Sequence, residues 1–471
     1  MMCPAMCREP YGGEEVWIPI MIKRRSFLSV LSAGAVALLT RNVFGGVVGG
    51  GRKPNIIIIL ADDLGYEDVS CQGAKDLATP NIDRLSKDGV RFTEGYVSAP
   101  VCSPSRAGLL TGRYQQRFGH EFNTPVGRRP EVGLPVSEKT MGDRLRAAGY
   151  ATGWVGKSHL GSSPQFHPLN RGFDEFFGFL ASVHRYTPPH NNPKNPVCRG
   201  FEPVVENEYL TDALTREAVS FMTRHKDEPF FLYVAYNAIH GPMEDPPAKY
   251  TGRFPQITDW AKLVHAGMVA ALDDGVGAML GKLSELRLEQ DTLVFFLSDN
   301  GGARGNGSDN GMLSGVKGTL QEGGIRVPFL MQWKGRAPAG KVYREPVISL
   351  DICVTALGAA GVGEGGSAPL DGVDLVPFVA GQAQGSPHER LYWRMGAEYA
   401  IRQGKWKLLK TGDGPPRLFD LAGDVGETAD VSGREPEVVK QLGEAYARWD
   451  AQLAKPLWKP PAYRGQVQLE D

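Results

Sequence analysis

The chain has 471 residues, of which 42% are hydrophobic and 22% charged, a composition typical of an ordinary globular protein. Its 52 basic and 53 acidic side chains nearly balance, so no global charge attracts it to nucleic acid or to an anionic membrane. The length favours two or three domains. The six cysteines are scattered without a CxxC pair or a zinc-like Cys/His spacing, which argues against a disulfide scaffold. One bridge among Cys71, Cys198 and Cys353 stays open as an alternative.

The first 50 residues form an extension that precedes the first predicted strand. Arg24 and Arg25 stand before Ser-Phe-Leu and an uncharged apolar run that ends near Leu39. This run is too short for a permanent membrane span, and residues 21–45 resemble a bacterial twin-arginine export signal. The alternative is a basic amphipathic helix. A glycine-rich linker follows at residues 45–51. We therefore expect an exported protein, periplasmic or extracellular, without a permanent membrane span.

Strand and helix signals then alternate. An unbroken β-branched run at residues 54–60 predicts a central strand covered on both faces. Residues 79–89 predict a helix with Thr79 as its cap and Pro80 in its first turn. Further helices are predicted at residues 137–149, 209–226 and 260–286, and further strands at residues 150–156, 229–237 and 292–300. This alternation predicts an α/β fold, in which helices sandwich a large, mixed, mostly parallel sheet over residues 51–375.

The pattern changes after about residue 375. Residues 390–410 and 417–421 have the alternation and turns of short antiparallel strands, and residues 435–453 have the pattern of a helix. We expect residues 376–471 to form a small C-terminal α+β subdomain that packs on the main domain.

Polar side chains follow four of the predicted strands at their carboxyl ends, where open α/β sheets bind ligands. Taken singly, each has a structural explanation as a helix cap, a turn residue or a loop histidine. Taken together, three carboxylates and one amide oxygen form the hard oxygen set that Ca²⁺ or Mg²⁺ prefers. Cationic and donor groups beside such a metal would suit a tetrahedral oxyanion. The oxygen set is Asp62, Asp63, Asp299 and Asn300, and the cationic or donor set is Arg106, Lys157, His159, His240 and Lys317.

Cys102 stands before Ser-Pro-Ser-Arg and an apolar, helix-like run. Pro104 suits the first turn of a helix, which places Cys102 at a helix amino terminus. The helix dipole lowers the pKa of a thiol at that position, so a cysteine nucleophile is a first hypothesis. A hard, oxygen-liganded metal is a poor neighbour for a thiolate, however, and an oxygen nucleophile would fit it better.

The segment from Cys102 to Arg106, followed by Ala-Gly-Leu-Leu-Thr-Gly, resembles the signature of the type I sulfatases of the alkaline phosphatase superfamily. In that family the cysteine is oxidised after translation to Cα-formylglycine by a formylglycine-generating enzyme. Further family segments occur in the family's order, and the resemblance covers about residues 54–420. They are "ADD", "VGKSHLG", "HPLNRGFDEFFGF", "IHGP", "LSDNGG", "GVKGTLQEGGIRVP" and "RQGKWKLL".

The resemblance implies hydrolysis of a sulfate ester through formylglycine made from Cys102, with bound Ca²⁺ or, alternatively, Mg²⁺. The implied metal ligands are Asp62, Asp63, Asp299, Asn300 and the modified residue 102. By the same resemblance, Arg106 would support the hydrated aldehyde and His159 would transfer protons there. Lys157 and Lys317 would bind the sulfate oxygens. His240, with Lys317, would protonate the leaving alcohol. His184 is a further candidate for substrate contact, with a structural role as the alternative.

Export and family together favour a sulfated carbohydrate as the substrate. Residues 167–186 loosely resemble enzymes that act on 6-sulfated galactose or N-acetylgalactosamine, and aryl sulfates often serve as surrogate substrates in this family. The alternatives are a phosphonate or phosphate ester hydrolase of the same superfamily, a non-catalytic sulfoglycan-binding protein, and a thiol hydrolase.

Overall fold

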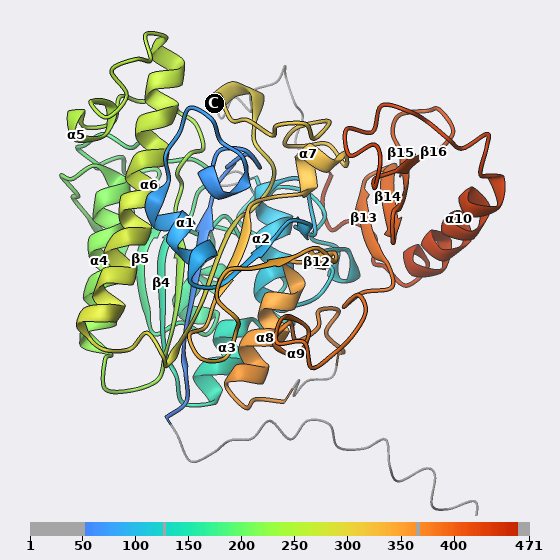
Figure 1. The fold of residues 1–471 in the computed structure, drawn as a ribbon. Helices are drawn as coiled ribbons and strands as arrows, with labels where there is room; N and C mark the ends of the chain where they lie inside the picture. Colours follow the sequence, from blue (N-terminus) through green and yellow to red (C-terminus); the bar gives the residue numbers. More distant parts are fainter. Residues whose placement is uncertain (1–51, 126–128, 364–367, 460–471) are drawn as a thin grey trace, which may run out of the picture. The chain divides into compact units, whose positions relative to one another are not determined.

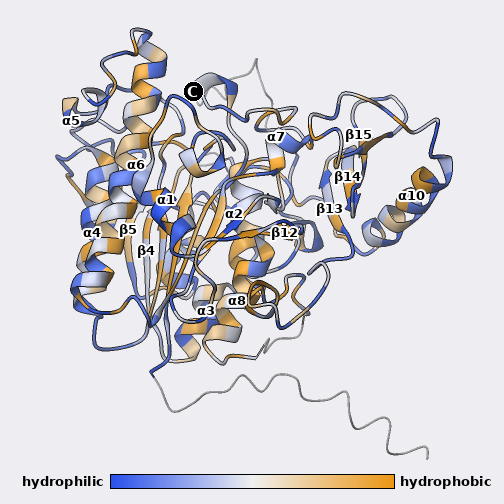
Figure 2. Ribbon diagram, in the orientation of Figure 1, coloured by the Kyte–Doolittle hydropathy of each residue, from blue (hydrophilic) through white to orange (hydrophobic). Residues whose placement is uncertain are grey.

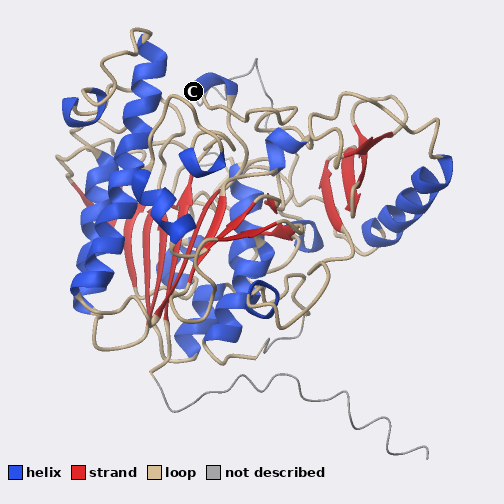
Figure 3. Cartoon of the chain, viewed as in Figure 1, coloured by secondary structure: helices blue, strands red, loops and turns tan. Residues whose placement is uncertain are grey.

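A ten-stranded sheet forms the centre of the protein (Figures 1 and 3). The computed structural model describes residues 52–125, 129–363 and 368–459, so the predicted export signal and the linker lie outside the described residues. In sheet order the strands are β11 (Lys341–Tyr343), β2 (Val90–Phe92), β10 (Phe329–Gln332), β9 (Thr292–Ser298), β1 (Asn55–Ala61), β8 (Phe230–Ala235), β4 (Ala151–Lys157), β5 (Glu175–Phe179), β6 (Val197–Arg199) and β7 (Glu202–Val204).

The middle of this sheet is parallel: β9, β1, β8, β4 and β5 pair in the same direction. The antiparallel pairs lie toward the edges, where β10 pairs with β9 and β2, and β6 pairs with β5 and β7. The predicted large, mixed, mostly parallel sheet is therefore confirmed. All strands predicted before residue 300 are present, each within about two residues of its expected bounds.

Helices cover both faces of the sheet, as predicted. The α-helices are α1 (Pro80–Lys87), α2 (Cys102–Thr111), α3 (Met141–Ala147), α4 (Leu210–Arg224), α5 (Ala248–Thr251), α6 (Trp260–Glu285), α7 (Glu322–Ile325), α8 (Leu350–Ala359), α9 (Val376–Val379) and α10 (Pro436–Asp450). Side chains alternate along β1, so Ile57 and Ile59 pack in one core with residues of α1, α4 and α6. Ile56, Ile58 and Leu60 pack in a second core with residues of α2, α3 and α8. The central strands are accordingly hydrophobic along their length (Figure 2).

Thr79 stands at the N-cap of α1 as predicted, but the prediction that its side chain caps the helix is wrong. Thr79 precedes the helix, but its side chain makes no cap hydrogen bond to it and instead accepts one from the backbone N–H of Ser70 at 2.9 Å. The free N–H groups of α1 are bound by a distant residue, because Asp273 of α6 accepts from Asn81 at 3.0 Å and from Ile82 at 2.8 Å. A tertiary contact thus replaces the local cap.

Helix α6 contains an 18-residue segment that is long and apolar enough, by length and composition, to cross a membrane. However, 78% of that segment is buried inside the protein, where α6 packs against neighbouring helices such as α4. This burial is typical of a core helix. It explains why α6 is apolar nearly all round.

A second, four-stranded antiparallel sheet lies toward the C-terminus, as expected. It comprises β13 (Leu391–Met395), β14 (Glu398–Gln403), β15 (Trp406–Lys410) and β16 (Arg417–Asp420). One of its faces packs against α10, and the other shares a core with residues of the main sheet region, including Tyr96 and Leu350. Tyr96 belongs to a short two-stranded sheet of β3 (Gly95–Tyr96) and β12 (Val347–Ile348). Residues 50–471 form one compact unit by their contacts, so the subdomain boundary at residue 376 stays a prediction.

A buried ion network links the C-terminal sheet to α7. The Nζ atom of Lys407, in β15, lies 2.9 Å from Oε1 of Glu322 and 2.8 Å from Oε1 of Glu427. Glu427 also accepts a hydrogen bond from the backbone N–H of Glu322 at 2.7 Å. The side chains of Lys407 and both glutamates are fully buried, so each charge depends on its partners.

Candidate active site

Four neighbouring strands bring the predicted site residues together. Asp62 and Asp63 follow β1, Asp299 and Asn300 follow β9, His240 lies beyond the end of β8, and Lys157 is the last residue of β4. Since β9, β1, β8 and β4 are adjacent and parallel, their carboxyl ends meet at one edge of the sheet. Helix α2 supplies Cys102 and Arg106, and the segment between β9 and α7 supplies Lys317.

The nucleophile candidate and the acidic residues form one cluster. Ligand atoms of Asp62, Asp63, Cys102 and His240 all lie within 4.8 Å of one another. The Sγ atom of Cys102 is 3.5 Å from Oδ1 of Asp62. Asp299 is tied to the same cluster, since its Oδ1 accepts a hydrogen bond from the backbone N–H of Asp63 at 3.3 Å. Every carboxylate here is buried.

Three cationic side chains balance the three carboxylates. Lys157 places its Nζ 2.5 Å from Oδ2 of Asp62, and Lys317 places its Nζ 2.8 Å from Oδ1 of Asp63. The Arg106 guanidinium contacts Oδ2 of Asp299 through Nε at 2.8 Å and through a terminal nitrogen at 2.7 Å. The Lys157 and Arg106 side chains are fully buried, whereas Lys317 remains 19% exposed. The cluster is therefore close to neutral before any metal ion is added.

Cys102 is the first residue of α2, as predicted from Pro104. Burial raises the pKa of its thiol, but the ammonium groups of Lys157 and Lys317 outweigh burial, and the net pKa falls to about 7. The backbone N–H of Ser103 donates to the side chain of Asn123 at 3.0 Å, which orients this first helical turn. The position therefore favours an anionic nucleophile.

The oxygen set fits a hard divalent cation. Burial raises the pKa of Asp62, and burial together with the charge of Asp62 raises that of Asp299 to about 6, despite the nearby cations. Such crowding of carboxylates favours a bound positive charge. The Oδ1 atom of Asn300 is buried and has no hydrogen-bond partner among the described residues, while its Nδ2 donates to Asp63 at 2.7 Å. An amide oxygen left free beside carboxylates is the donor that Ca²⁺ or Mg²⁺ would use.

The three predicted histidines differ in environment. Burial, followed by the charges of Lys157 and Arg106, lowers the pKa of His159 well below its usual range, and neither ring nitrogen has a hydrogen-bond partner among the described residues. Burial and two lysines would lower the pKa of His240, but Asp63 and Asp62 outweigh them and the net pKa is raised. His240 has Nε2 3.8 Å from Asp63. His159 is thus held neutral, whereas His240 favours its charged form and is suited to donate a proton.

His184 lies one strand further along the sheet. It follows β5, whose last residue, Phe179, pairs with Lys157 and packs its ring 4.9 Å from the His184 ring. The Nε2 atom of His184 is buried and unpartnered among the described residues. No contact joins His184 directly to the acidic cluster in the described part of the chain, so a role in substrate contact stays a prediction.

Two supporting residues were missed by sequence reasoning. Asn306 donates from Nδ2 to the backbone oxygens of Ile239 at 3.0 Å and Asp63 at 3.5 Å, which joins the ends of β8 and β1. The hydroxyl of Tyr186 donates to the backbone oxygens of Asn237 and His240. Both act through backbone groups of distant segments, and the sequence carries no local signal for such contacts.

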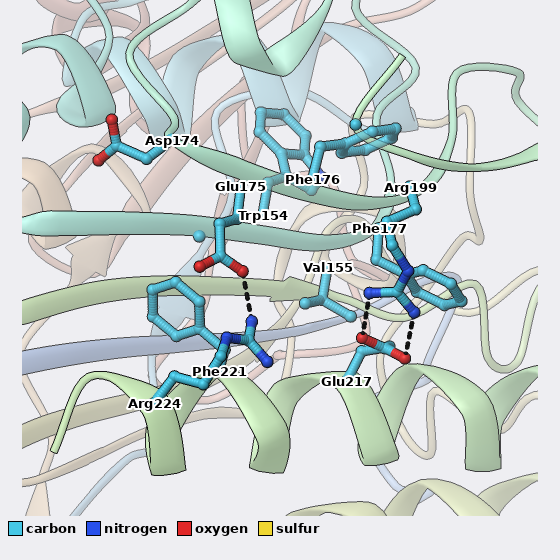
Figure 4. A pocket seen from close by; sticks show the side chains of 12 residues that line it. Trp154, Val155, Asp174, Glu175, Phe176, Phe177, Arg199, Glu217, Phe221 and Arg224 are labelled. Atoms are coloured by element: carbon cyan, nitrogen blue, oxygen red, sulfur yellow. Dashed lines mark hydrogen bonds and ion pairs between the residues drawn. The ribbon is translucent and has the colours of Figure 1, made fainter. Parts of the chain in front are cut away.

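A well-defined cavity of about 320 Å³ lies away from this site (Figure 4). It lies between α4 and the first half of β5, whereas the acidic cluster lies at the opposite, carboxyl end of the strands. Its charged side chains are already paired, Arg199 with Glu217 at 2.6 Å and Arg224 with Glu175 (Figure 4), and Asp174 with Arg146 at 2.7 Å. The cavity therefore offers no unpaired group for the chemistry at the strand ends.

Comparison with known proteins identifies the family. A family profile described as Sulfatase matches residues 54–362, which contain every residue of the site. The chain belongs to the sulfatase family. This sulfatase is 36% identical to N-acetylgalactosamine-6-sulfatase of Canis lupus familiaris over 389 residues, which cover 77% of this chain and 72% of the relative. It is also 34% identical to arylsulfatase A of Homo sapiens over 495 residues, which cover 91% and 92% of the two chains.

A solved structure agrees with this assignment. The structure titled "Crystal structure of Ps i-CgsB in complex with k-i-k-neocarrahexaose" superposes on this sulfatase with a TM-score of 0.83 and 38% identity. The match covers 87% of this chain and 95% of the other. The α/β fold and the sulfatase activity predicted from sequence are thereby confirmed.

Proposed function

We propose that this sulfatase removes sulfate from a sulfated carbohydrate, with a formylglycine formed from Cys102 as the nucleophile and Ca²⁺ as the metal. The observation that carries the proposal is the position of Cys102 at the start of α2, where its thiol contacts Asp62 and its pKa is lowered by the charges of Lys157 and Lys317. The carbohydrate is supported by relatives and a structural neighbour whose names or titles specify sulfated or sugar ligands. Mg²⁺ is the alternative metal.

The metal would be held by the carboxylates of Asp62, Asp63 and Asp299 and by the amide oxygen of Asn300, with residue 102 as a further ligand. When bound, a divalent cation would act there as a Lewis acid that makes an oxygen nucleophile more acidic and offsets charge on sulfate. The fit depends on the free Oδ1 of Asn300 and on the raised pKa values of Asp62 and Asp299.

The modified residue would supply a hydrated aldehyde, whose two hydroxyls allow one to attack sulfur and the other to assist release of sulfate. Arg106 lies one helical turn after residue 102 and would steady this group, since its own orientation is held by Asp299. His159 is neutral because it is buried among cations, and its ring nitrogens are unpartnered among the described residues, so one of them can accept a hydrogen bond from the hydrate. A plain thiol or hydroxyl has no second hydroxyl for the release step.

Lys157 and Lys317 would bind the sulfate oxygens. Each ammonium group already lies beside a carboxylate of the cluster, one at Asp62 and the other at Asp63, so both cations would lie near a sulfate bound at residue 102. His240 would then protonate the leaving alcohol, since Asp63 and Asp62 favour its charged form. An unactivated sugar alkoxide is a poor leaving group, which makes this proton necessary.

The proposed function also includes export of the protein. The twin-arginine-like segment at residues 21–45 would carry the protein to the periplasm or the exterior, where sulfated polysaccharides are met. A formylglycine-generating enzyme would be its maturation partner.

Mass spectrometry of the tryptic peptide 92–106 tests the nucleophile, using protein made beside a formylglycine-generating enzyme. An aldehyde or its hydrate at residue 102 supports the proposal, and an unmodified thiol under conditions that mature a control sulfatase refutes it. The same preparation should hydrolyse 4-nitrophenyl sulfate faster than 4-nitrophenyl phosphate. Cys102→Ala should lower kcat by roughly 10³-fold or more. A preference for the phosphate would instead favour the phosphate ester hydrolase.

A further inference from the structure

The loop that follows His240 holds two exposed side chains in place through two adjacent carboxylates. Glu244 accepts from Nε of Arg185 at 2.8 Å, and Asp245 accepts from the indole Nε1 of Trp260 at 2.7 Å. The Arg185 side chain is nevertheless 65% exposed, and Trp260 is 55% exposed. A single exposed tryptophan is unremarkable on a protein surface. An exposed arginine and tryptophan fixed by neighbouring residues of one loop form a more specific arrangement, here named the Arg185–Trp260 platform.

This loop is rigidly attached. The Glu244 carboxylate also accepts hydrogen bonds from the backbone N–H groups of Tyr186 at 2.8 Å and Thr187 at 2.9 Å. The Tyr186 hydroxyl in turn contacts the backbone oxygen of His240 at 2.7 Å. Prolines at positions 242, 246 and 247 further restrict the backbone. The platform therefore has a defined position relative to His240, five residues before Asp245.

The platform is also connected to the site through α6. Trp260 is the first residue of that helix, and His265, about one turn further on, contacts the backbone oxygen of Asn306 at 3.0 Å. Asn306 supports the backbone of Asp63, the residue after Asp62 in the acidic cluster. The amino-terminal end of α6 is thus connected to the reaction centre through two contacts. Trp260 lies about 8 Å along the helix from His265.

We propose that Arg185 and Trp260 form a subsite for a second sugar of the substrate, next to the sugar that loses its sulfate. The indole face would pack on the C–H face of that sugar, and the guanidinium would bind a sulfate group that the sugar carries. The inference rests on the proposed function, because it extends the carbohydrate site outward from His240. It assigns this protein an oligosaccharide with sulfate on adjacent units in preference to an isolated sugar.

The chemistry of the pair supports this ligand. Tryptophan combines a large apolar face with one polar N–H, and Asp245 already engages the N–H, which leaves the ring as the binding surface. Arginine binds tetrahedral oxyanions through several donors. Glu244 accepts from Nε of Arg185 at 2.8 Å and Thr187 accepts from one terminal nitrogen at 3.2 Å, while the other terminal nitrogen has no partner among the described residues. Both side chains lose little conformational entropy on binding because the carboxylates hold them beforehand.

The test compares long and short substrates. Trp260→Ala and Arg185→Ala should each lower kcat/KM on sulfated galactan and glycosaminoglycan hexasaccharides by about 3- to 10-fold, mainly through KM. Turnover of 4-nitrophenyl sulfate, which is too small to reach the platform, should stay within about twofold. Phe201→Ala is the matched control, because Phe201 is 54% exposed but lies between β6 and β7 at the edge of the sheet.

The outcomes separate the inference from the proposed function. A loss confined to hexasaccharides, absent in Phe201→Ala, supports the subsite. Unchanged kinetics on hexasaccharides, or an equal loss of kcat/KM on both substrates, overturns the subsite but leaves the proposed sulfatase function in place. If the unaltered enzyme hydrolyses 4-nitrophenyl sulfate but no hexasaccharide, the carbohydrate assignment fails together with the subsite. If it hydrolyses neither after formylglycine has been verified, the proposed function itself fails.

Discussion

Replacing Lys407 by Met should destabilise the protein strongly, because it leaves two buried carboxylates without their shared cation. Lys407 contacts Glu322 at 2.9 Å and Glu427 at 2.8 Å, and all three side chains are fully buried. Removing one partner of a buried ion pair costs about 3–5 kcal/mol. With an unfolding entropy of about 2.1 cal/mol/K per residue, a unit of roughly 400 residues should then melt about 4–6 °C lower. Differential scanning calorimetry at pH 7 measures this shift.

Lys405→Met is the matched control. Lys405 lies two residues away and pairs with Asp420 at 2.6 Å, but its side chain is 51% exposed. A surface pair contributes about 0–1 kcal/mol, so this variant should melt within about 1 °C of the unaltered protein. Equal Tm values for the two variants would refute the reasoning, since Lys407 is buried against two carboxylates whereas Lys405 is half-exposed and pairs with one.

The pH dependence supplies an independent check. Burial would raise the pKa of Glu322, but Lys407 and two arginines outweigh it and lower the pKa from 4.5 to about 2. A carboxyl whose folded pKa is lowered contributes stability above its unfolded pKa, and this contribution is lost as the pH falls through the folded pKa. The Tm difference between the unaltered protein and Lys407→Met should therefore narrow as the pH falls from about 5 to 2. The pKa of Glu427 is raised, because burial and the charge of Glu322 outweigh Lys407, so protonation of Glu427 contributes to the narrowing at the upper end of this range. A difference that stays constant over this range would contradict the charge-based account.

Three further outcomes follow from the site. His240→Gln should slow hydrolysis of a sugar sulfate by about 10²-fold or more but affect 4-nitrophenyl sulfate much less, because nitrophenolate leaves without a proton; equal losses in kcat would contradict its role as the acid. Exhaustive chelation should abolish turnover and lower Tm, and added Ca²⁺ should restore both, whereas full activity in metal-free protein verified by elemental analysis would exclude the metal. Asn306→Ala should weaken Ca²⁺ affinity about 10- to 100-fold in a calorimetric titration, because Asn306 supports the backbone of Asp63 and Ile239; unchanged affinity would remove it from the support of the site.

Much of the fold can be predicted from the sequence because the patterns that indicate its strands and helices are local. The apolar run of β1 predicts a strand buried on both faces, and in the structure all seven residues of β1 are buried, the six apolar ones in two cores. Pro104 predicts the start of α2 at Cys102 from backbone restrictions alone. The polar residues at the ends of β1 and β9 could be expected to meet because parallel strands end at a common edge.

Contacts between distant segments were decided only by the tertiary structure. Asp273 caps α1 in place of Thr79, although 192 residues separate it from Asn81. Lys407 pairs with Glu322 across 85 residues. A local sequence pattern predicts the role of a residue within its own helix or strand. The partner of a buried charge, in contrast, depends on which helices and strands pack together in the cores. The sequence by itself thus determined the chemistry available at the strand ends, and packing decided which groups hold that chemistry in position.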